Sequence, residues 1–352
     1  MGRIDKAFSA DGILVALVFA VAMALLALRP AAAQEVEDPV FRSDVRLVRI
    51  LATVKNASGA PVGGLSQEDF RIIDGDAERE IAVFERRTNR PLSVALLVDA
   101  SLSTAIDMAF EKRSARRFLS NLLSDGSDPD DRAAVLTFSE GVEMLSNFTH
   151  QERRLHRAVD RIEPETGTSM YDAVMLASEE LSRRRGRRVL VVITDGGDTT
   201  SYSNFRQALE AAHEADAVIY GVTVVPIKSD AGRNTGGENA LNMMARGTGG
   251  MSFIEYGEEA LDRAFSEILS NLRTQYLLAY YPPKHEDSRV RFRRIEVSVS
   301  RPGATVLARN GYYVPEESKI LPESISPSRV SVGPNKRPPP AETSNQGKRE
   351  DE

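Results

Sequence analysis

One apolar segment, Leu92–Val98, constrains the fold of this chain more than any other. Only Ser93 interrupts its run of apolar side chains. A strand of a parallel sheet is covered by helices on both faces, so such strands are apolar at every position rather than at alternate ones. The segment therefore predicts a central, fully buried strand of an α/β sheet.

Polar side chains follow this strand directly: Asp99, Ser101 and Ser103 stand at two-residue intervals. Beyond them, apolar residues recur at the spacing of an amphipathic helix, namely Ile106, Ala109, Phe110, Phe118, Leu119 and Leu122. In an open α/β sheet, such a strand-to-helix turn lies at the carboxyl edge, where ligands bind. Oxygen side chains there suit a hard cation such as Mg²⁺. They are equally suited to capping the amides of a helix N-terminus.

Two further segments place oxygen-bearing side chains in the same way. Leu190–Ile193 is a second apolar strand that runs through Thr194 into Asp195. Between the two strands, residues 166–173 form a turn that contains Thr168 and enters another amphipathic helix. Each candidate residue thus stands at the end of a strand or the start of a helix.

The three segments together resemble the metal-ion-dependent adhesion site of von Willebrand factor A domains. Asp99-x-Ser101-x-Ser103 resembles the first loop of that site, and Thr168 and Asp195 match the residues that the other two loops supply. The resemblance implies that Ser101, Ser103 and Thr168 ligate Mg²⁺ (or Mn²⁺ or Ca²⁺), with Asp99 and Asp195 acting directly or through water. Because the hydroxyl ligands are neutral, the cation keeps surplus positive charge, and an Asp or Glu of a protein ligand would complete its coordination.

Strands and helices alternate from about residue 91 to 273, which predicts a doubly wound, mainly parallel sheet. The other expected strands are 133–138, 190–193, 217–224 and 251–254, and the other expected helices are 155–162, 171–181, 205–215, 239–246 and 260–272. Gly186 is expected to end a helix before the strand that contains Leu190.

Strands are also predicted on both sides of this α/β segment. They are expected at 48–55, 70–76 and 81–84, and again at 276–281, 295–299 and 304–309. Because three short strands make a marginal sheet, we expect the two groups to form one small β-sandwich into which the α/β domain is inserted. Residues 59–70, 276–283 and 309–313 also resemble a bacterial family of exported VWFA-related proteins, and this resemblance covers about 45–314.

The N-terminus predicts export. Arg3 and Lys6 precede an apolar run at 13–28, and small residues follow it up to Ala33. This is the pattern of a cleaved secretory signal peptide, which would make the mature protein periplasmic or secreted. The alternative is an uncleaved anchor, which would tether the chain to a membrane.

Composition sets the remaining bounds. A net charge of −6 argues against a nucleic-acid binder, and the absence of cysteine excludes disulfides and thiol nucleophiles. The predicted organisation is a signal peptide at 1–33, part of a β-sandwich at 34–90, an A domain at 91–273, the rest of the sandwich at 274–314 and a disordered tail at 315–352.

Other polar residues favour structural roles. Five arginines of the basic run 183–188 would complement the dipole of a helix C-terminus. Asp172 would stabilise the first turn of its helix, and Asp198 would cap the next helix or line its loop. The histidines show no metal-ligand spacing and are expected at the surface, at positions 150, 156, 213 and 285.

An enzyme is the least favoured class. Asp99 could accept a phosphoryl group, but the dehalogenase-like pattern needs a second acid where Ser101 stands. Ser101 and Ser103 also lack the Gly-x-Ser-x-Gly motif of a serine hydrolase. We therefore expect an exported, metal-dependent, adhesion-type binding module that is not an enzyme. The alternatives are a scaffold with a vestigial metal site and, third, a phosphoryl-transfer enzyme.

Overall fold

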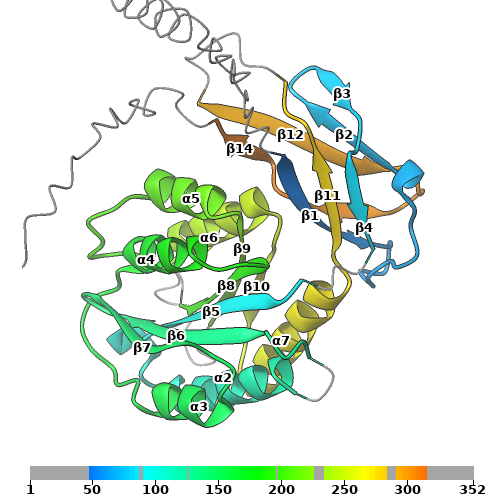
Figure 1. Ribbon diagram of the computed structural model, residues 1–352. Coiled ribbons are helices and arrows are strands. Elements are labelled where there is room, and N and C mark those ends of the chain that lie inside the picture. The colour runs from blue at the N-terminus through cyan, green and yellow to red at the C-terminus, as the bar shows by residue number, and fades with distance from the viewer. Residues whose placement is uncertain are drawn as a thin grey trace, which may run out of the picture. The chain divides into compact units, whose positions relative to one another are not determined.

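The computed structural model describes residues 47–86, 90–124, 127–195, 197–225, 234–283 and 291–314 (Figure 1). The predicted signal peptide at 1–33 and the predicted tail at 315–352 lie outside these residues, as does His285. In the described part of the chain, no helix is both long enough and apolar enough to cross a bilayer.

A six-stranded sheet forms the centre of the α/β domain, in the order β10-β9-β8-β5-β6-β7. The strands are β5 (Leu92–Asp99), β6 (Arg132–Phe138), β7 (Val142–Thr149), β8 (Arg187–Thr194), β9 (Ala217–Val224) and β10 (Ser252–Glu255). All neighbouring pairs are parallel except β6 and β7. Every residue of β5 is buried, as its unbroken apolar sequence predicts.

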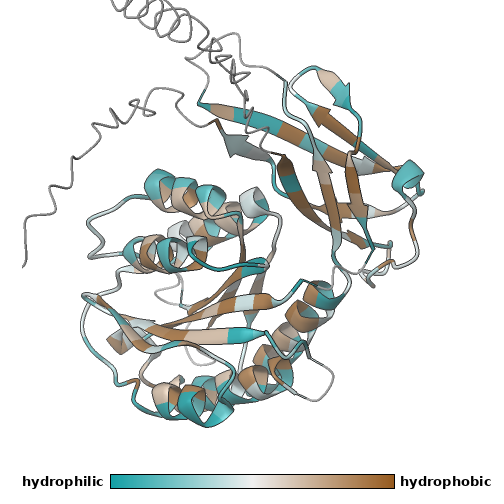
Figure 2. Ribbon diagram, in the orientation of Figure 1, coloured by the Kyte–Doolittle hydropathy of each residue, from teal (hydrophilic) through white to brown (hydrophobic). Residues whose placement is uncertain are grey.

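Helices cover both faces of this sheet (Figure 1). On one face, α2 (Met108–Leu122), α3 (Glu152–Asp160) and α7 (Glu258–Arg273) pack against residues such as Val94 and Leu96. On the other face lie α4 (Met170–Ser182), α5 (Phe205–Glu214) and α6 (Thr235–Thr248). In Figure 2 the strands between them are largely brown, whereas the helices mix brown and teal. The predicted doubly wound architecture is confirmed.

Strands from both ends of the described chain form two four-stranded antiparallel sheets, in the orders β13-β1-β11-β4 and β14-β12-β2-β3. The N-terminal elements are β1 (Val48–Lys55), η1 (Gln67–Asp69), β2 (Phe70–Asp74), β3 (Ala77–Arg79) and β4 (Val83–Glu85). The C-terminal elements are β11 (Tyr276–Tyr280), β12 (Phe292–Val299), β13 (Thr305–Leu307) and β14 (Gly311–Tyr313). Their shared core includes Ile50, Ile72 and Leu278. The insertion of the α/β domain in a β-sandwich is thus confirmed, while the exact domain boundaries stay a prediction.

A buried carboxylate, Asp74, connects strands of the sandwich that are far apart in the sequence. Its Oδ2 accepts hydrogen bonds from the hydroxyls of Tyr280 and Tyr312, each at 3.0 Å. Its Oδ1 accepts one from Arg293 Nε at 2.9 Å, which is also an ion pair. Because Asp74 is fully buried, these bonds compensate its desolvation.

Three details differ from the sequence predictions. Ile106, expected on the apolar face of a helix, is 85% exposed because α2 begins only at Met108. His213, expected at the surface, is buried on α5. Strands β3, β7 and β14 were not expected, since short or partly exposed edge strands carry a weak alternating pattern. Gly186 does lie in the turn after α4, with a φ of +87° that other residues rarely adopt.

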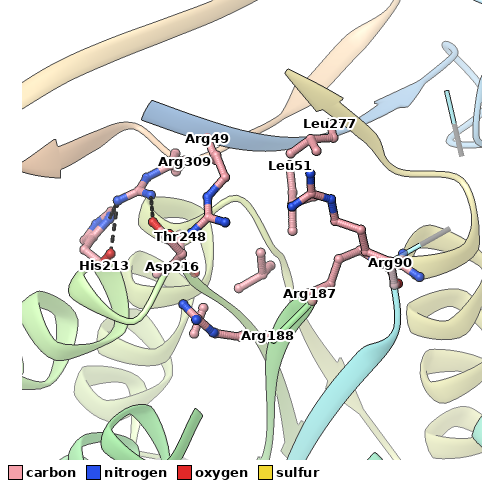
Figure 3. A pocket seen from close by; sticks show the side chains of 13 residues that line it. Arg49, Leu51, Arg90, Arg187, Arg188, His213, Asp216, Thr248, Leu277 and Arg309 are labelled. Carbon is pink, nitrogen blue, oxygen red and sulfur yellow. Dashed lines mark hydrogen bonds and ion pairs between the residues drawn. The ribbon is translucent and has the colours of Figure 1, made fainter. Parts of the chain in front are cut away.

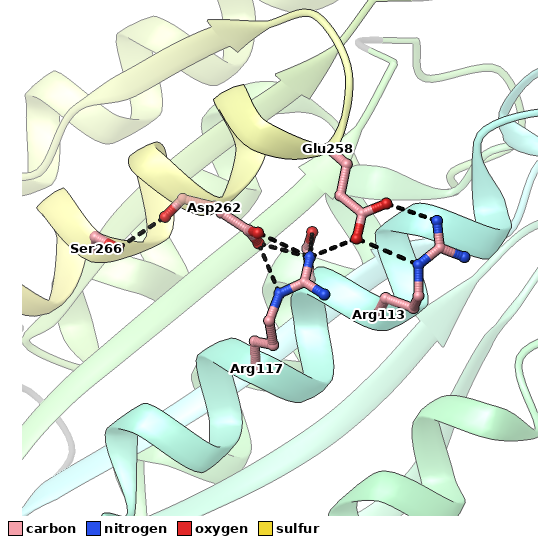
Figure 4. A network of polar contacts seen from close by, with 6 residues as sticks. Arg113, Arg117, Glu258, Asp262 and Ser266 are labelled. Carbon is pink, nitrogen blue, oxygen red and sulfur yellow. Dashed lines mark hydrogen bonds and ion pairs between the residues drawn. The ribbon is translucent and has the colours of Figure 1, made fainter.

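An ion-pair network joins α2 to α7 (Figure 4). Glu258 accepts from Arg113 Nη2 and from Arg117 Nη2, each at 2.6 Å. Arg117 also lies 2.8 Å from Asp262. The two arginines lower the pKa of Glu258 from 4.5 to about 2.

Glu258→Gln is expected to lower the stability of the protein, with a pH dependence set by this shift. The stabilisation from a lowered pKa is fully present above the unfolded value of 4.5 and is lost as the pH falls through about 2. The difference between the unaltered protein and the variant, measured by urea unfolding, should therefore be constant from pH 7 to 5 and should shrink by pH 3.

Glu259→Gln is the matched control, because Glu259 lies in the same first turn of α7 and is exposed. It changes the charge near the helix dipole equally. A stability difference for Glu258→Gln that is the same at pH 3 and pH 7 would contradict the assignment.

Candidate functional site

Asp99 ends β5 at the carboxyl edge of the central sheet. It is fully buried. Its Oδ1 accepts a hydrogen bond from Ser101 N at 2.8 Å, and its Oδ2 accepts one from Thr194 Oγ1 at 2.6 Å. Because Val98 is paired with Ile193 in the parallel ladder, Asp99 lies beside Thr194 and next to the start of the loop that carries Asp195.

The loop after β5 brings the two serine hydroxyls together. Ser101 Oγ and Ser103 Oγ are 2.9 Å apart. The short helix η2 (Leu102–Thr104) shapes the loop, and Thr104 Oγ1 donates to the carbonyl oxygen of Ser101 at 2.8 Å. Ser101 is buried and Ser103 is exposed. The pair of hydroxyls therefore lies at the protein surface, with one serine buried and the other exposed to solvent.

The capping alternative is not supported by this geometry. Ser101 precedes η2 but its side chain makes no capping hydrogen bond. The N-cap residue of α2 is Asp107, which also makes none. In the described chain, the hydroxyl of Ser101 contacts the hydroxyl of Ser103 and also hydrogen-bonds the Asp99 carboxylate.

The loop that contains Thr168 is hydrogen-bonded to the loops that follow β8 and β5. Its amide donates to Thr199 Oγ1 at 3.0 Å, and its carbonyl accepts from Thr199 N at 2.8 Å. Three residues earlier, Glu165 N donates to Ala100 O at 2.7 Å. These bonds join the Thr168 loop to the loops that follow β8 and β5. Thr168 is buried, and no hydrogen bond among the described residues uses its hydroxyl.

The charge of Asp195 acts on the carboxylate of Asp99. Burial raises the pKa of Asp99 from 3.8 to about 6, and the charge of Asp195 adds to the rise. The hydrogen bonds from Thr194 and Ser101 oppose it. The structure therefore brings together the edge positions of the sequence prediction: Asp99, Ser101 and Ser103 on one loop, with Thr168 and Asp195 on loops bonded or paired to it.

One carboxylate near this edge, Glu111, was not predicted from the sequence. It is only 1% exposed, and it lies on the buried face of α2 together with Met108, Ala115 and Phe118. Burial raises its pKa well above 4.5, and the charges of Asp99, Asp107 and Asp195 raise it further. A signal was available, because residues 108, 111, 115 and 118 follow helical spacing and only one of them is charged.

Asp172 and Asp198 organise loops. Asp198 Oδ2 accepts from Tyr171 N at 3.0 Å in the first turn of α4. Asp198 Oδ2 also accepts from Ser201 Oγ at 2.7 Å, so it lines its own loop, as the sequence suggested, and in addition bonds the helix that precedes it. Asp172 accepts from the amides of Tyr202 and Ser203, each at 2.9 Å. Both residues have structural partners.

A second candidate is a cavity of about 550 Å³, open solvent at its mouth included, lined by five arginines (Figure 3). Arg309 lies 2.7 Å from Asp216, and Arg188 Nη1 donates to Ala215 O at the end of α5. Arg187 donates to Leu272 O near the end of α7. Arg187 and Arg188, two arginines of the basic run, thus complement the C-terminal ends of α7 and α5, in agreement with the structural interpretation of these two residues.

His213 borders the same cavity, and its Nδ1 lies 3.3 Å from Arg309 Nη2. Burial and the positive charge of Arg309 lower its pKa to about 3. The imidazole is therefore neutral at physiological pH. Because the arginines described above have structural partners and His213 is neutral, we keep the carboxyl edge of the sheet as the candidate site.

A doubly wound α/β domain with hydroxyls and carboxylates converging from separate loops at its carboxyl edge defines an A-domain-like module. Residues 94–197 match the family model of the von Willebrand factor type A domain, and this part of the chain is a von Willebrand factor A domain.

The chain is also similar to solved structures, while none of the curated proteins matches it in sequence. The vWF domain of the type V pili tip protein Mfa5 from Porphyromonas gingivalis is 14% identical, with a TM-score of 0.44, and the match covers 51% of this chain and 94% of that one. BatB from Bacteroides thetaiotaomicron is 19% identical, with a TM-score of 0.42, and the match covers 52% of this chain and 100% of that one. The pilus adhesin SpaC from Lactobacillus rhamnosus GG is 10% identical, with a TM-score of 0.45, and the match covers 71% of this chain and 48% of that one. At these identities the functions of those proteins do not transfer to this chain.

Proposed function

We propose that this chain is an exported binding module whose A domain holds a divalent cation and, through it, a carboxylate of a protein partner. The observation that carries the proposal is the convergence at one sheet edge. The hydroxyl oxygens of Ser101 and Ser103 lie 2.9 Å apart. Beside them is the buried carboxylate of Asp99, which accepts hydrogen bonds from Ser101 N and from Thr194 Oγ1.

The donor set fits a hard cation. Among the described residues, no ion pair involves the buried carboxylates of Asp99 and Glu111, although buried carboxylates without a counter-charge are costly. In the same residues, no group of three or more Asp, Glu or His side chains is arranged to hold a metal ion. A cation here would therefore depend on the hydroxyls of Ser101, Ser103 and Thr168, as hard-cation sites can.

Each residue has a distinct role in this proposal. The hydroxyls would contact the cation, and Asp99 and Asp195 would balance its charge directly or through water. When bound, Mg²⁺ (or Mn²⁺ or Ca²⁺) supplies an open coordination position to which an Asp or Glu of the partner is attracted. Because neutral hydroxyls leave surplus positive charge, the site favours binding an anion over catalysis.

The same proposal places the protein outside the cytoplasm, periplasmic or secreted, on the basis of its predicted signal peptide. An uncleaved signal would add a membrane tether. A scaffold with a vestigial site is the second candidate, favoured by the well-packed sandwich.

A pair of substitutions at Thr168 tests the site. Thr168→Ala removes the hydroxyl and is expected to weaken Mg²⁺ binding by at least about tenfold. Thr168→Ser keeps the hydroxyl and should bind like the unaltered protein. Calorimetric titration of Mg²⁺ measures both. Equal, weak binding by all three proteins would favour the scaffold, and turnover of phosphoryl or ester substrates would revive the enzyme alternative.

A further inference from the structure

Glu111 is a buried carboxylate without a structural explanation in the fold. Its Oε2 is buried and has no hydrogen-bond partner in the described part of the chain. Its neighbours on the same face of α2, such as Ala115 and Phe118, belong to the apolar core. An unsatisfied buried acceptor destabilises a protein, so its presence needs a compensating partner that the described side chains do not supply.

The charges around Glu111 have the same sign as its own. Asp99, Asp107 and Asp195 all act on it, and none of them takes part in an ion pair among the described residues. The three arginines of α2 are used elsewhere, because Arg113 and Arg117 bond Glu258 on α7 and Arg116 bonds Asp160. Glu111 is therefore an unpartnered buried acceptor beside the residues assigned above to the cation.

We propose that Glu111 is a positioning residue of the metal site, which would help to hold a hydrated cation together with Asp99 and Asp195. This inference rests on the proposed function and extends it by one residue outside the three loops. The cation and its waters would supply the missing partner of the Glu111 carboxylate. The site would then bind its metal more tightly than the loops alone allow, and the apo protein would carry the repulsion of the carboxylates.

The isosteric substitution Glu111→Gln tests this role with two readouts of opposite sign. The affinity for Mg²⁺, measured by calorimetry, should fall by about 10- to 100-fold, the usual effect of removing an outer-shell partner. The melting temperature of the chelator-treated protein should rise, by about 2–4 °C for each kcal/mol of repulsion removed. A residue with a purely structural role would lower the melting temperature and leave the affinity unchanged.

Glu111→Met is the second variant, since it fills the same space without a polar atom. It should show the same two effects. Asp131→Asn is the matched control, because Asp131 is a buried carboxylate at the opposite end of β5, where it accepts from Leu92 N at 2.6 Å. It should reduce stability and leave the Mg²⁺ affinity unaltered.

The outcomes separate the two proposals. If Asp99→Asn loses Mg²⁺ binding and Glu111→Gln keeps it, the role of Glu111 is refuted and the metal site stands. If the unaltered protein shows no saturable binding of Mg²⁺ or Mn²⁺, both are refuted.

Discussion

Replacing Asp99 by asparagine is expected to reduce the affinity for Mg²⁺ by more than about 100-fold, exceeding the effect of losing an outer-shell partner. Asp99 is the central carboxylate of the proposed site, fully buried and bonded to Ser101 and Thr194. Asparagine keeps the shape of the side chain but removes the charge that balances a divalent cation. Calorimetric titration with Mg²⁺ and with Mn²⁺ measures the loss.

Asp130→Asn is the control for this substitution, because it removes the charge of an aspartate whose side chain is 78% exposed. It should bind Mg²⁺ like the unaltered protein. Circular dichroism and thermal unfolding of Asp99→Asn verify that the fold is retained. Saturable binding of unaltered strength in a folded Asp99→Asn variant would exclude a cation at this loop.

The largest expected effect on stability is that of Asp74→Ala, a loss of about 3–5 kcal/mol in the free energy of unfolding. The substitution leaves Arg293 without its ion-pair partner and the hydroxyls of Tyr280 and Tyr312 without their acceptor. These three residues belong to the C-terminal part of the sandwich, whereas Asp74 belongs to its N-terminal part. Urea unfolding at neutral pH measures the loss.

Asp76→Ala is the matched control, two residues away and exposed in the turn between β2 and β3. A surface change of this kind usually alters stability by no more than about 0.5 kcal/mol. If the two variants unfold at the same urea concentration, the carboxylate of Asp74 does not hold the sandwich together.

The α/β architecture could be predicted from the sequence because its signals are local. The apolar run at Leu92–Val98 and the amphipathic stripes of α3 and α7 each depend on neighbouring residues alone. The edge strands β3, β7 and β14 could not be predicted in the same way. The residues of β3 and β7 are exposed or partly buried, and β14 has only three residues, so pairing with a distant strand decides their conformation.

The residues of the candidate site could be selected from the sequence, but their proximity could not be derived from it. Asp99 and Asp195 come close because β5 and β8 are neighbours in the sheet, although more than 80 residues separate them in the chain. Thr168 joins them through hydrogen bonds with Thr199. Such contacts depend on strand order, which a single sequence does not encode locally.

Buried polar residues were the other class that the sequence did not reveal. Glu111 was overlooked because the helical stripe was traced through apolar residues alone. His213 was expected at the surface, yet Arg309, a residue almost 100 positions away, covers it. In both cases the burial of a polar side chain depends on segments distant in the sequence.

A crystal structure with Mn²⁺ would locate the proposed cation through the anomalous signal of the metal. We expect one strong anomalous peak at the carboxyl edge of the sheet, in contact with the hydroxyl oxygens of Ser101 and Ser103 and near Asp99, Thr168 and Asp195. A well-diffracting crystal at saturating Mn²⁺ with no peak at this edge would contradict it.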